Sequence, residues 1–166
     1  MDIPPNKQVT EKDELILRFV KREGVLYPWR KMVIGLDGYM RAGKTTLASF
    51  LSWQLGMPFV PLDEFHIRGQ DYPNLKVKEL KVLIETRLGD DRPVIIEGFM
   101  LLTSLDQLGL SPDLYIWVDS PDGGGFPISN KDLLPSDVYP AYVEYRKRLL
   151  EITPDYVCKW REESPK

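Results

Sequence analysis

The stretch Gly38-Tyr39-Met40-Arg41-Ala42-Gly43-Lys44-Thr45 has the form G-x-x-x-x-G-K-T. Glycines allow the backbone to adopt positive φ angles and to approach a phosphate with no Cβ in the way. Successive amide N–H groups of such a loop form an anion-binding site, to which the start of the following helix adds its partial positive charge. The stretch therefore predicts a loop that binds the phosphates of a nucleoside triphosphate. We expect the nucleotide contacts to come from Gly38, Tyr39, Met40, Arg41, Ala42, Gly43, Lys44, Thr45 and Thr46.

The sequence on both sides of this loop fits the strand–loop–helix context that the pattern requires. Lys31–Leu36 is a short apolar run, which predicts a buried parallel strand. Thr46–Leu55 carries apolar residues at helical spacing, and Gly56 ends the pattern. A chance match in a glycine-containing turn would lack these flanks. In this setting Lys44 is expected to contact the β- and γ-phosphates, and the Thr45 hydroxyl is expected to bind Mg²⁺.

Length and composition predict one domain that spans residues 1–166. The chain has 22 Lys and Arg against 25 Asp and Glu, so it has no overall basic field and we do not expect it to bind nucleic acid. A single cysteine, Cys158, excludes an internal disulfide and is typical of a cytoplasmic protein. No stretch has the pattern of a signal peptide or the length of a membrane span, so no membrane association is expected.

Strands and helices are predicted to alternate along the chain. Beyond the loop and its flanks, apolar runs predict strands at Pro58–Leu62, Pro93–Ile96, Leu114–Val118 and Tyr156–Trp160. Helical spacing predicts helices at Leu75–Leu88, Thr103–Leu108 and Asp137–Glu151. Residues 1–30 are expected to form a helical N-terminal extension, and residues 120–136, rich in Pro and Gly, a loop. This order predicts an α/β protein with a three-layer P-loop NTPase fold, a mostly parallel central sheet and helices on both faces.

Acidic residues follow three of the predicted strands. Asp63 and Glu64 follow the second strand, Glu97 the third and Asp119 the fourth. Because ligands of such sheets bind beyond the carboxyl ends of the strands, we expect these side chains to converge with the loop on one cleft.

Two of these acids have candidate roles in phosphoryl transfer. That reaction needs neutralisation of the phosphate charge and a group that accepts the proton of the attacking hydroxyl. Asp63 is predicted to be the catalytic base, with Lys44 as the second catalytic residue, although Asp63 could instead cap the following turn. Glu97 is predicted to bind Mg²⁺ together with Thr45 and Asp63, and the alternative is a surface carboxylate that bonds the turn at Gly98.

The segment after Asp63 offers candidate substrate contacts. His66 is the only histidine, so we expect it to line the cleft rather than to bind a metal. In Asp71-Tyr72-Pro73, the Asp could accept sugar hydroxyls and the Tyr could stack on a ring. Taken alone, this segment is better interpreted as a proline-containing turn. The full predicted substrate set is Asp63, Glu64, Phe65, His66, Asp71 and Tyr72.

With these residues in place, the chain resembles the uridine kinase and nicotinamide riboside kinase group of small P-loop kinases. The likeness is carried by Val33–Leu36 with the loop and Thr45-Thr46-Leu47-Ala48, by Leu62–His66, by Asp71-Tyr72-Pro73, by Val94–Leu102 and by Val138–Arg146. The resemblance implies that ATP and Mg²⁺ are the cofactors and that a hydroxyl of a nucleoside-like or riboside-like small molecule is the acceptor. It also implies that Asp63 is the base and that Asp71 holds ribose hydroxyls. We expect a monomer or a homodimer.

The chain departs from this group in the segment where a lid helix carries several arginines. Ser120–Tyr145 contains no arginine and only one lysine, Lys131. Lid cations stabilise the transferred phosphoryl group, so their loss lowers the expected rate unless Arg41 or Arg68 substitutes for them. Two alternatives therefore stay open: a nucleotide-binding protein with little or no transferase activity, and a small kinase for a non-nucleoside hydroxyl acceptor.

Overall fold

The computed structural model describes residues 17–18, 21, 30–69, 71–119 and 134–158. Most of the expected N-terminal extension, residues 120–133 of the predicted loop and the end of the last predicted strand lie outside these residues. The strands are β1 (Met32–Gly38), β2 (Phe59–Pro61), β3 (Pro93–Glu97), β4 (Leu114–Val118) and β5 (Tyr156–Cys158). The helices are α2 (Lys44–Leu55), the short 3-10 helix η1 (Leu62–Phe65), α3 (Val77–Gly89), α4 (Leu101–Leu108) and α5 (Tyr139–Leu150).

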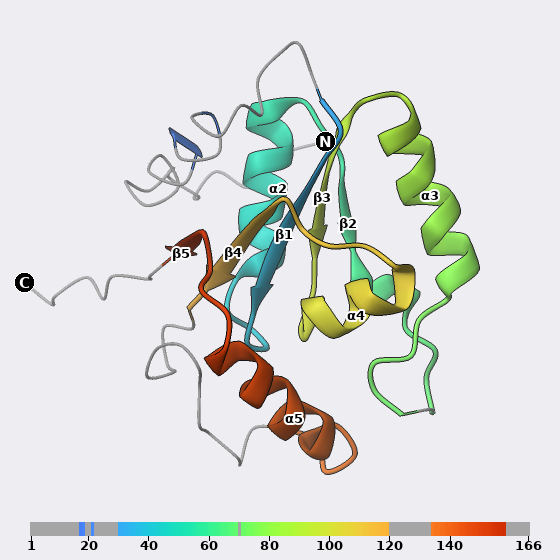
Figure 1. Cartoon of the computed structure of the whole chain (residues 1–166), viewed down its shortest axis with the longest axis vertical. Coiled ribbons are helices and arrows are strands. Elements are labelled where there is room, and N and C mark those ends of the chain that lie inside the picture. Colours follow the sequence, from blue (N-terminus) through green and yellow to red (C-terminus); the bar gives the residue numbers. More distant parts are fainter. Residues whose placement is uncertain (1–16, 19–20, 22–29, 70, 120–133, 159–166) are drawn as a thin grey trace, which may run out of the picture.

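The five strands form one parallel sheet in the order β2-β3-β1-β4-β5 (Figure 1). The strand that leads into the phosphate loop, β1, is therefore central, with β3 on one side and β4 on the other. Leu36 pairs with Glu97 and Gly38 with Val118, so the loop and the end of β3 meet at the same edge of the sheet. The predicted parallel α/β architecture is confirmed.

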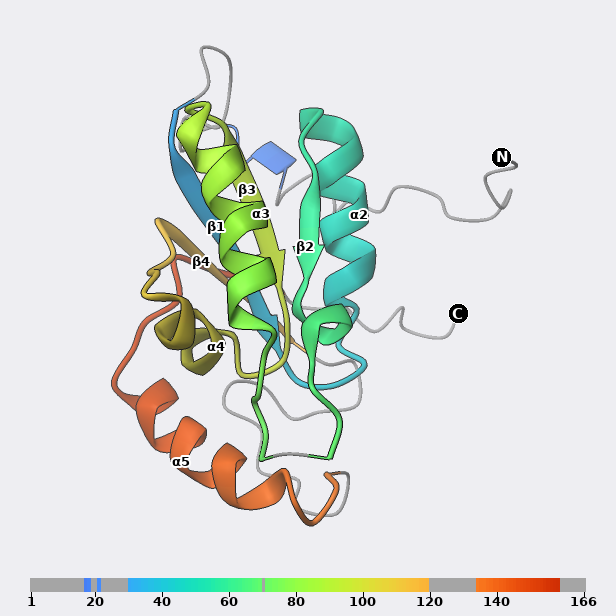
Figure 2. The same cartoon turned by 90° about the vertical axis from the view of Figure 1, so that its right-hand side faces the viewer.

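Helices cover both faces of this sheet (Figures 1 and 2). Helix α2 lies on one face, where Leu47 and Leu51 pack with Ile34 of β1. Helices α3, α4 and α5 lie on the other face, where Ile84 packs in a core with Val33. All seven residues of β1 are buried, as expected for a parallel strand covered on both sides. The two cores hold the sheet, and with it the loop, between two layers of helix.

One boundary differs from its prediction and concerns the site. Strand β2 ends at Pro61 rather than at Leu62, and Asp63 lies in the 3-10 helix η1 instead of directly at a strand end. Proline has no N–H to donate to a strand ladder, so it is suited to the last position of an edge strand. The turn of η1 follows at once and brings Asp63 beyond the edge of the sheet.

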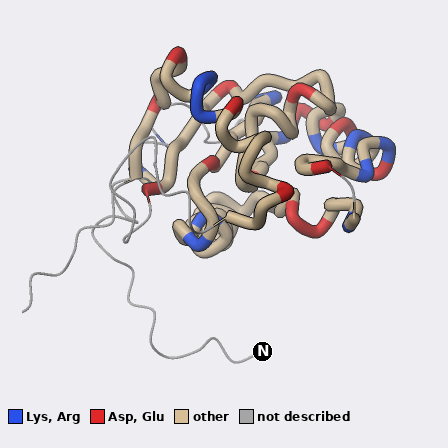
Figure 3. Tube along the Cα trace, turned by 90° about the horizontal axis from the view of Figure 1, so that it is seen from below, with Lys and Arg blue, Asp and Glu red and all other residues tan. Residues whose placement is uncertain are grey.

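Acidic and basic residues are interspersed along the described trace (Figure 3). None of the helices in the described part of the chain has the length and apolar character needed to cross a membrane.

Candidate functional site

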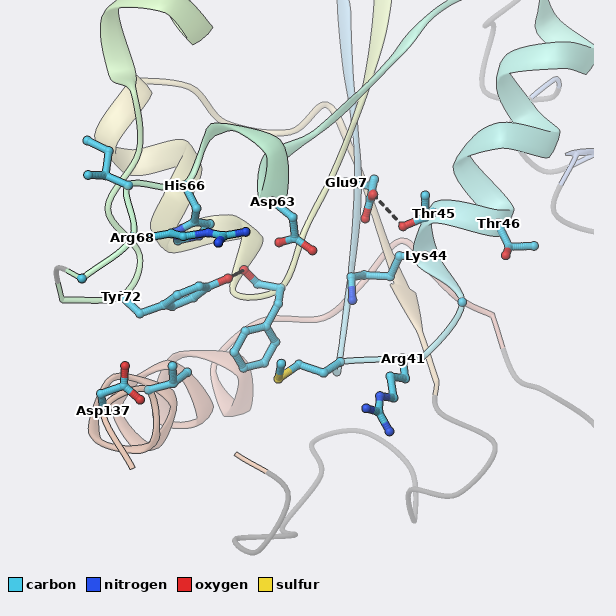
Figure 4. A pocket seen from close by; sticks show the side chains of 16 residues that line it. Arg41, Lys44, Thr45, Thr46, Asp63, His66, Arg68, Tyr72, Glu97 and Asp137 are labelled. Carbon is cyan, nitrogen blue, oxygen red and sulfur yellow. Dashed lines mark hydrogen bonds between the residues drawn. The ribbon is translucent and has the colours of Figure 1, made fainter. Parts of the chain in front are cut away.

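A cavity of about 680 Å³ lies beyond the carboxyl ends of the strands (Figure 4). This volume is within the range of roughly 300–1,000 Å³ that is typical of small-molecule sites. One side is lined by Met40, Arg41, Gly43, Lys44, Thr45 and Thr46, and the other by Asp63, His66, Ile67, Arg68, Gly69 and Tyr72. The residues that complete it are Glu97, Phe99, Asp137 and Val138. The phosphate loop and the segment after β2 therefore face one another across a single space.

The phosphate loop has the backbone geometry of an anion-binding site. Gly43 precedes α2 with a φ of 90°, and no described side chain caps this helix start. The first turn of α2 carries no acidic residue of its own, and its N–H groups lack partners within the helix. At the other end of the loop, a Cβ on Gly38 would lie 2.3 Å from the carbonyl oxygen of Val118, so the approach of β1 to β4 requires glycine there. The backbone N–H groups of the loop are therefore suited to bind the oxygen atoms of phosphate groups.

Lys44 is buried at the cavity wall. Its Nζ donates a hydrogen bond to the carbonyl oxygen of Tyr39 at 2.8 Å. Burial lowers the pKa of Lys44, while the charges of Asp37, Glu97 and Asp63 act in the opposite direction. The ammonium group is thus held beside the loop by a neutral acceptor, which leaves it able to exchange this bond for a phosphate oxygen.

Thr45 and Glu97 meet at the base of the cavity. The Thr45 hydroxyl donates to Glu97 Oε1 at 2.8 Å (Figure 4). Burial raises the pKa of Glu97, whereas the Thr45 hydrogen bond and the Lys44 charge favour the carboxylate. The N–H of Gly98 donates to Leu36 instead of to Glu97, so the alternative of a carboxylate that bonds its own turn is not observed.

These oxygen atoms fit a Mg²⁺ ion that also binds phosphate. No group of three or more His, Cys, Asp or Glu in the described part of the chain could hold a metal by itself. Mg²⁺ in phosphoryl-transfer sites is usually bound by one or two carboxylates together with substrate phosphates and water, so it needs no larger protein cluster. Thr45, Glu97 and Asp63 are the residues that could hold it, and this role stays a prediction.

Asp63 lines the cavity from the side opposite the loop (Figure 4). Its carboxylate is exposed and forms no hydrogen bond with any described residue, so the cap of a turn is not observed. Its charge influences Lys44 and His66 across the space. An unpaired carboxylate with this access can accept a proton from a bound hydroxyl.

His66 and Tyr72 form a flat wall next to Asp63. Their rings stack with centroids 4.3 Å apart and planes 12° from parallel. The Tyr72 hydroxyl donates to the carbonyl oxygen of Phe99 at 3.2 Å, which fixes the ring. Burial lowers the pKa of His66 and favours its neutral form, while the charge of Asp63 opposes this shift. The wall offers a surface on which a planar ring can stack.

Several predicted site residues do not line the cavity. Gly38, Tyr39 and Ala42 are the buried residues of the loop itself, and Phe65 packs against the core. Glu64 and Asp71 are exposed outside the cavity. Their predicted roles in binding stay predictions.

The expected convergence of acids does not extend to the end of β4. Asp119 is buried and accepts a hydrogen bond from Trp117 Nε1 at 2.9 Å, and it is not part of the cavity lining. Asp63 and Glu97 are the two of the predicted acids that the fold brings to the loop.

Sequence reasoning missed Asp37, the residue before the loop. Its side chain is completely buried, and its Oδ2 accepts hydrogen bonds from the hydroxyls of Tyr115, at 2.8 Å, and Tyr145. Oδ1 accepts from the N–H of Gly38 at 2.7 Å. Tyr145 is on α5, and its hydroxyl also accepts from the N–H of Leu102 in α4 at 3.2 Å. A charged residue that ends an otherwise apolar strand was the available indication in the sequence.

Comparison with known proteins supports the fold. A solved structure described as a possible uridine kinase from Bacillus stearothermophilus matches 90% of this chain and 98% of its own, with a TM-score of 0.54 and 18% sequence identity. No family model matches the chain. No curated protein matches it either. The chain therefore shares the overall fold of that matched structure, a parallel sheet with helices on both faces.

Proposed function

We propose that this protein is an ATP-dependent kinase that transfers the γ-phosphate to a hydroxyl of a nucleoside-like or riboside-like small molecule. The observation that carries the proposal is the single cavity between the phosphate loop and Asp63, with the Thr45–Glu97 pair at its base. A phosphate-binding loop alone would serve many nucleotide-binding proteins. An unpaired carboxylate across the same cavity adds the group that phosphoryl transfer to a hydroxyl requires.

On the loop side, the residues would bind and orient the phosphates. When bound, Mg-ATP would supply the γ-phosphoryl group. The N–H groups at the start of α2 and the ammonium of Lys44 would neutralise phosphate oxygens. Thr45 and Glu97 would hold the Mg²⁺ ion. Arg41, which also lines the cavity, adds a further cation on this side.

On the opposite side, Asp63 would accept the proton of the acceptor hydroxyl. As the acceptor oxygen forms its bond to the γ-phosphorus, the bond from that phosphorus to the β,γ-bridging oxygen breaks and ADP leaves. The stacked rings of His66 and Tyr72 would position a ring of the acceptor beside this carboxylate.

ADP release by the purified protein tests the proposal, measured with Mg-ATP alone and with a panel of nucleosides and other ribosides. We expect release that rises with acceptor concentration and that yields a phosphorylated acceptor by mass spectrometry. Mg²⁺-dependent ATP binding without acceptor-stimulated turnover would contradict the proposal. It would support a nucleotide-binding protein with little transfer activity, which the arginine-free stretch Ser120–Tyr145 keeps as the second candidate.

A further inference from the structure

The acceptor side of the cavity is lined by an arginine, whereas the acid that the resemblance to riboside kinases implies lies outside the lining. Arg68 lines the cavity together with His66 and Tyr72. Asp71, which would hold ribose hydroxyls, is exposed outside it. Among the described residues that line this wall, Arg68 is the one with a permanent positive charge, and its guanidinium can only donate hydrogen bonds.

Backbone hydrogen bonds hold the base of the loop that carries Arg68. Residues on both sides of the loop between η1 and α3 pair across its base: His66 bridges to Leu75, and the N–H of Ile67 donates to the carbonyl of Asn74 at 2.9 Å. Arg68 follows this pair directly. Its side chain thus extends from a hydrogen-bonded base into the cavity (Figure 4).

The guanidinium of Arg68 has no anionic partner among the described residues. Asp63 and Asp137 line the same cavity, yet neither forms an ion pair or hydrogen bond with it. An anion that binds Arg68 would therefore displace no existing pair. In the view of Figure 4, Asp63 lies between Arg68 and Lys44, so Arg68 is on the side of the base away from the phosphate loop.

Resting on the proposed kinase function, we propose that Arg68 selects an acceptor that carries an anionic group, a carboxylate or a phosphate, in addition to its reacting hydroxyl. Arginine pairs with such groups through two parallel hydrogen bonds, which fixes orientation as well as charge. The anion would dock on Arg68, a ring would lie against His66 and Tyr72, and the hydroxyl would reach Asp63. The preferred acceptor then differs from a neutral nucleoside by its charge.

Matched acceptor pairs test this inference. Uridine and orotidine differ by one carboxylate, and ribose and ribose 5-phosphate differ by one phosphate. With the wild-type protein and Mg-ATP, we expect the anionic member of at least one pair to be the better acceptor. Its kcat/KM should be roughly 10- to 100-fold higher than that of the neutral member, because a charge-assisted hydrogen bond contributes a free energy of that size. Calorimetry of the same compounds with Mg²⁺ and a non-hydrolysable ATP analogue gives a readout that does not depend on turnover.

Variants at Arg68, with Lys78 as the matched control, test the role of the guanidinium. Arg68→Ala should raise the KM of the anionic acceptor with little change for the neutral one, and Arg68→Lys should recover part of the difference because it keeps the charge but not the paired geometry. Lys78→Ala, which removes an exposed cation on α3 outside the cavity, should leave the preference unchanged. Both positions are exposed, so the variants should fold.

Two results would overturn the inference and leave the kinase function standing. The first is transfer that favours the neutral member of both pairs or makes no distinction. The second is an Arg68→Ala variant that loses turnover equally with neutral and anionic acceptors, which would place Arg68 on the transferred phosphoryl group. Absence of transfer to every acceptor despite tight Mg-ATP binding would instead contradict the proposed function itself.

Discussion

Two carboxylates at the ends of neighbouring central strands have opposite surroundings. Asp37 ends the apolar part of β1 and is enclosed by the hydroxyls of Tyr115 and Tyr145, which belong to β4 and α5. Glu97 ends β3 and is also buried, but its carboxylate contacts Thr45 and lines the cavity. Both carboxyl groups have a pKa that burial raises.

The two carboxyl groups differ in the groups that form hydrogen bonds with them. The oxygens of Asp37 accept hydrogen bonds from groups of the scaffold, so this carboxylate ties α5 and β4 to the start of the phosphate loop. Glu97 accepts one hydroxyl and, with the exposed Asp63, faces space that a ligand can fill. Asp37 thus holds the phosphate loop in place, whereas Glu97 and Asp63 can contact a ligand. Variants at these sites should therefore alter different observables.

The largest effect is expected for Asp63→Asn. Removal of the general base should lower kcat for acceptor phosphorylation by roughly 10²- to 10⁴-fold with little change in Mg-ATP binding. Steady-state ADP release at saturating ATP measures this. The matched control is Glu85→Gln, an exposed acid on α3 outside the cavity, which should turn over at the wild-type rate. Equal rates for Asp63→Asn and the wild type would show that another group accepts the proton.

A smaller effect is expected for Glu97→Gln. The amide keeps the shape and can still bond the Thr45 hydroxyl, but it loses the charge that a Mg²⁺ ion prefers. The Mg²⁺ concentration that gives half-maximal activity should rise roughly 10- to 100-fold. A magnesium titration at fixed ATP checks this prediction, and an unchanged midpoint would remove Glu97 from the metal site.

Tyr145→Phe should act on stability rather than on nucleotide binding. It removes a hydrogen bond to a buried carboxylate and leaves the N–H of Leu102 without its acceptor, at a cost of about 1.5–3 kcal/mol in the free energy of unfolding. Tyr115→Phe removes only the bond to Asp37 and should cost less. Urea unfolding of both variants measures the difference. Loss of ATP affinity in the folded Tyr145→Phe protein, at a temperature well below its midpoint, would contradict a purely scaffold role.

A further effect is a pH dependence of stability that Asp37→Asn should remove. Burial raises the pKa of Asp37 above its ordinary value of 3.8, so the folded state holds this proton when the unfolded state has already lost it. The protonated group therefore contributes its full free energy of stabilisation below pH 3.8, the ordinary pKa. This contribution is lost as the pH rises through the pKa of the folded state. The wild type should therefore lose stability relative to Asp37→Asn as pH rises from 4.5 to 7.5, by at most about 1.4 kcal/mol per pH unit.

Urea midpoints of the two proteins across that pH range are the measurement. A constant difference between them, or a wild type that gains stability relative to the variant with rising pH, would show that the charged form of Asp37 is not disfavoured by burial.

Local patterns were sufficient to predict the sheet, the loop and the positions of Asp63 and Glu97, because each is encoded in a short run of residues. Apolar runs predicted all five described strands, and the rule that ligands bind beyond strand ends placed Glu97 near Thr45. Asp37 was missed because its partners are 78 and 108 residues away in the chain. Asp119 was misplaced although its partner Trp117 is only two residues away, because the sequence does not show that the two side chains turn to the same side. Contacts between distant side chains depend on packing that no local pattern encodes.

The most direct test of this account is calorimetric titration of the wild type and of Lys44→Ala with ATP, each with and without Mg²⁺. Lys44 is the one lysine in the cavity lining formed by the described residues, and it faces the space where we place the β- and γ-phosphates. We expect the wild type to bind ATP more tightly when Mg²⁺ is present, and Lys44→Ala to bind it at least tenfold more weakly, because an ammonium beside phosphate makes charge-assisted hydrogen bonds. A wild type that binds no ATP, or a Lys44→Ala variant that binds it equally well, would contradict the account.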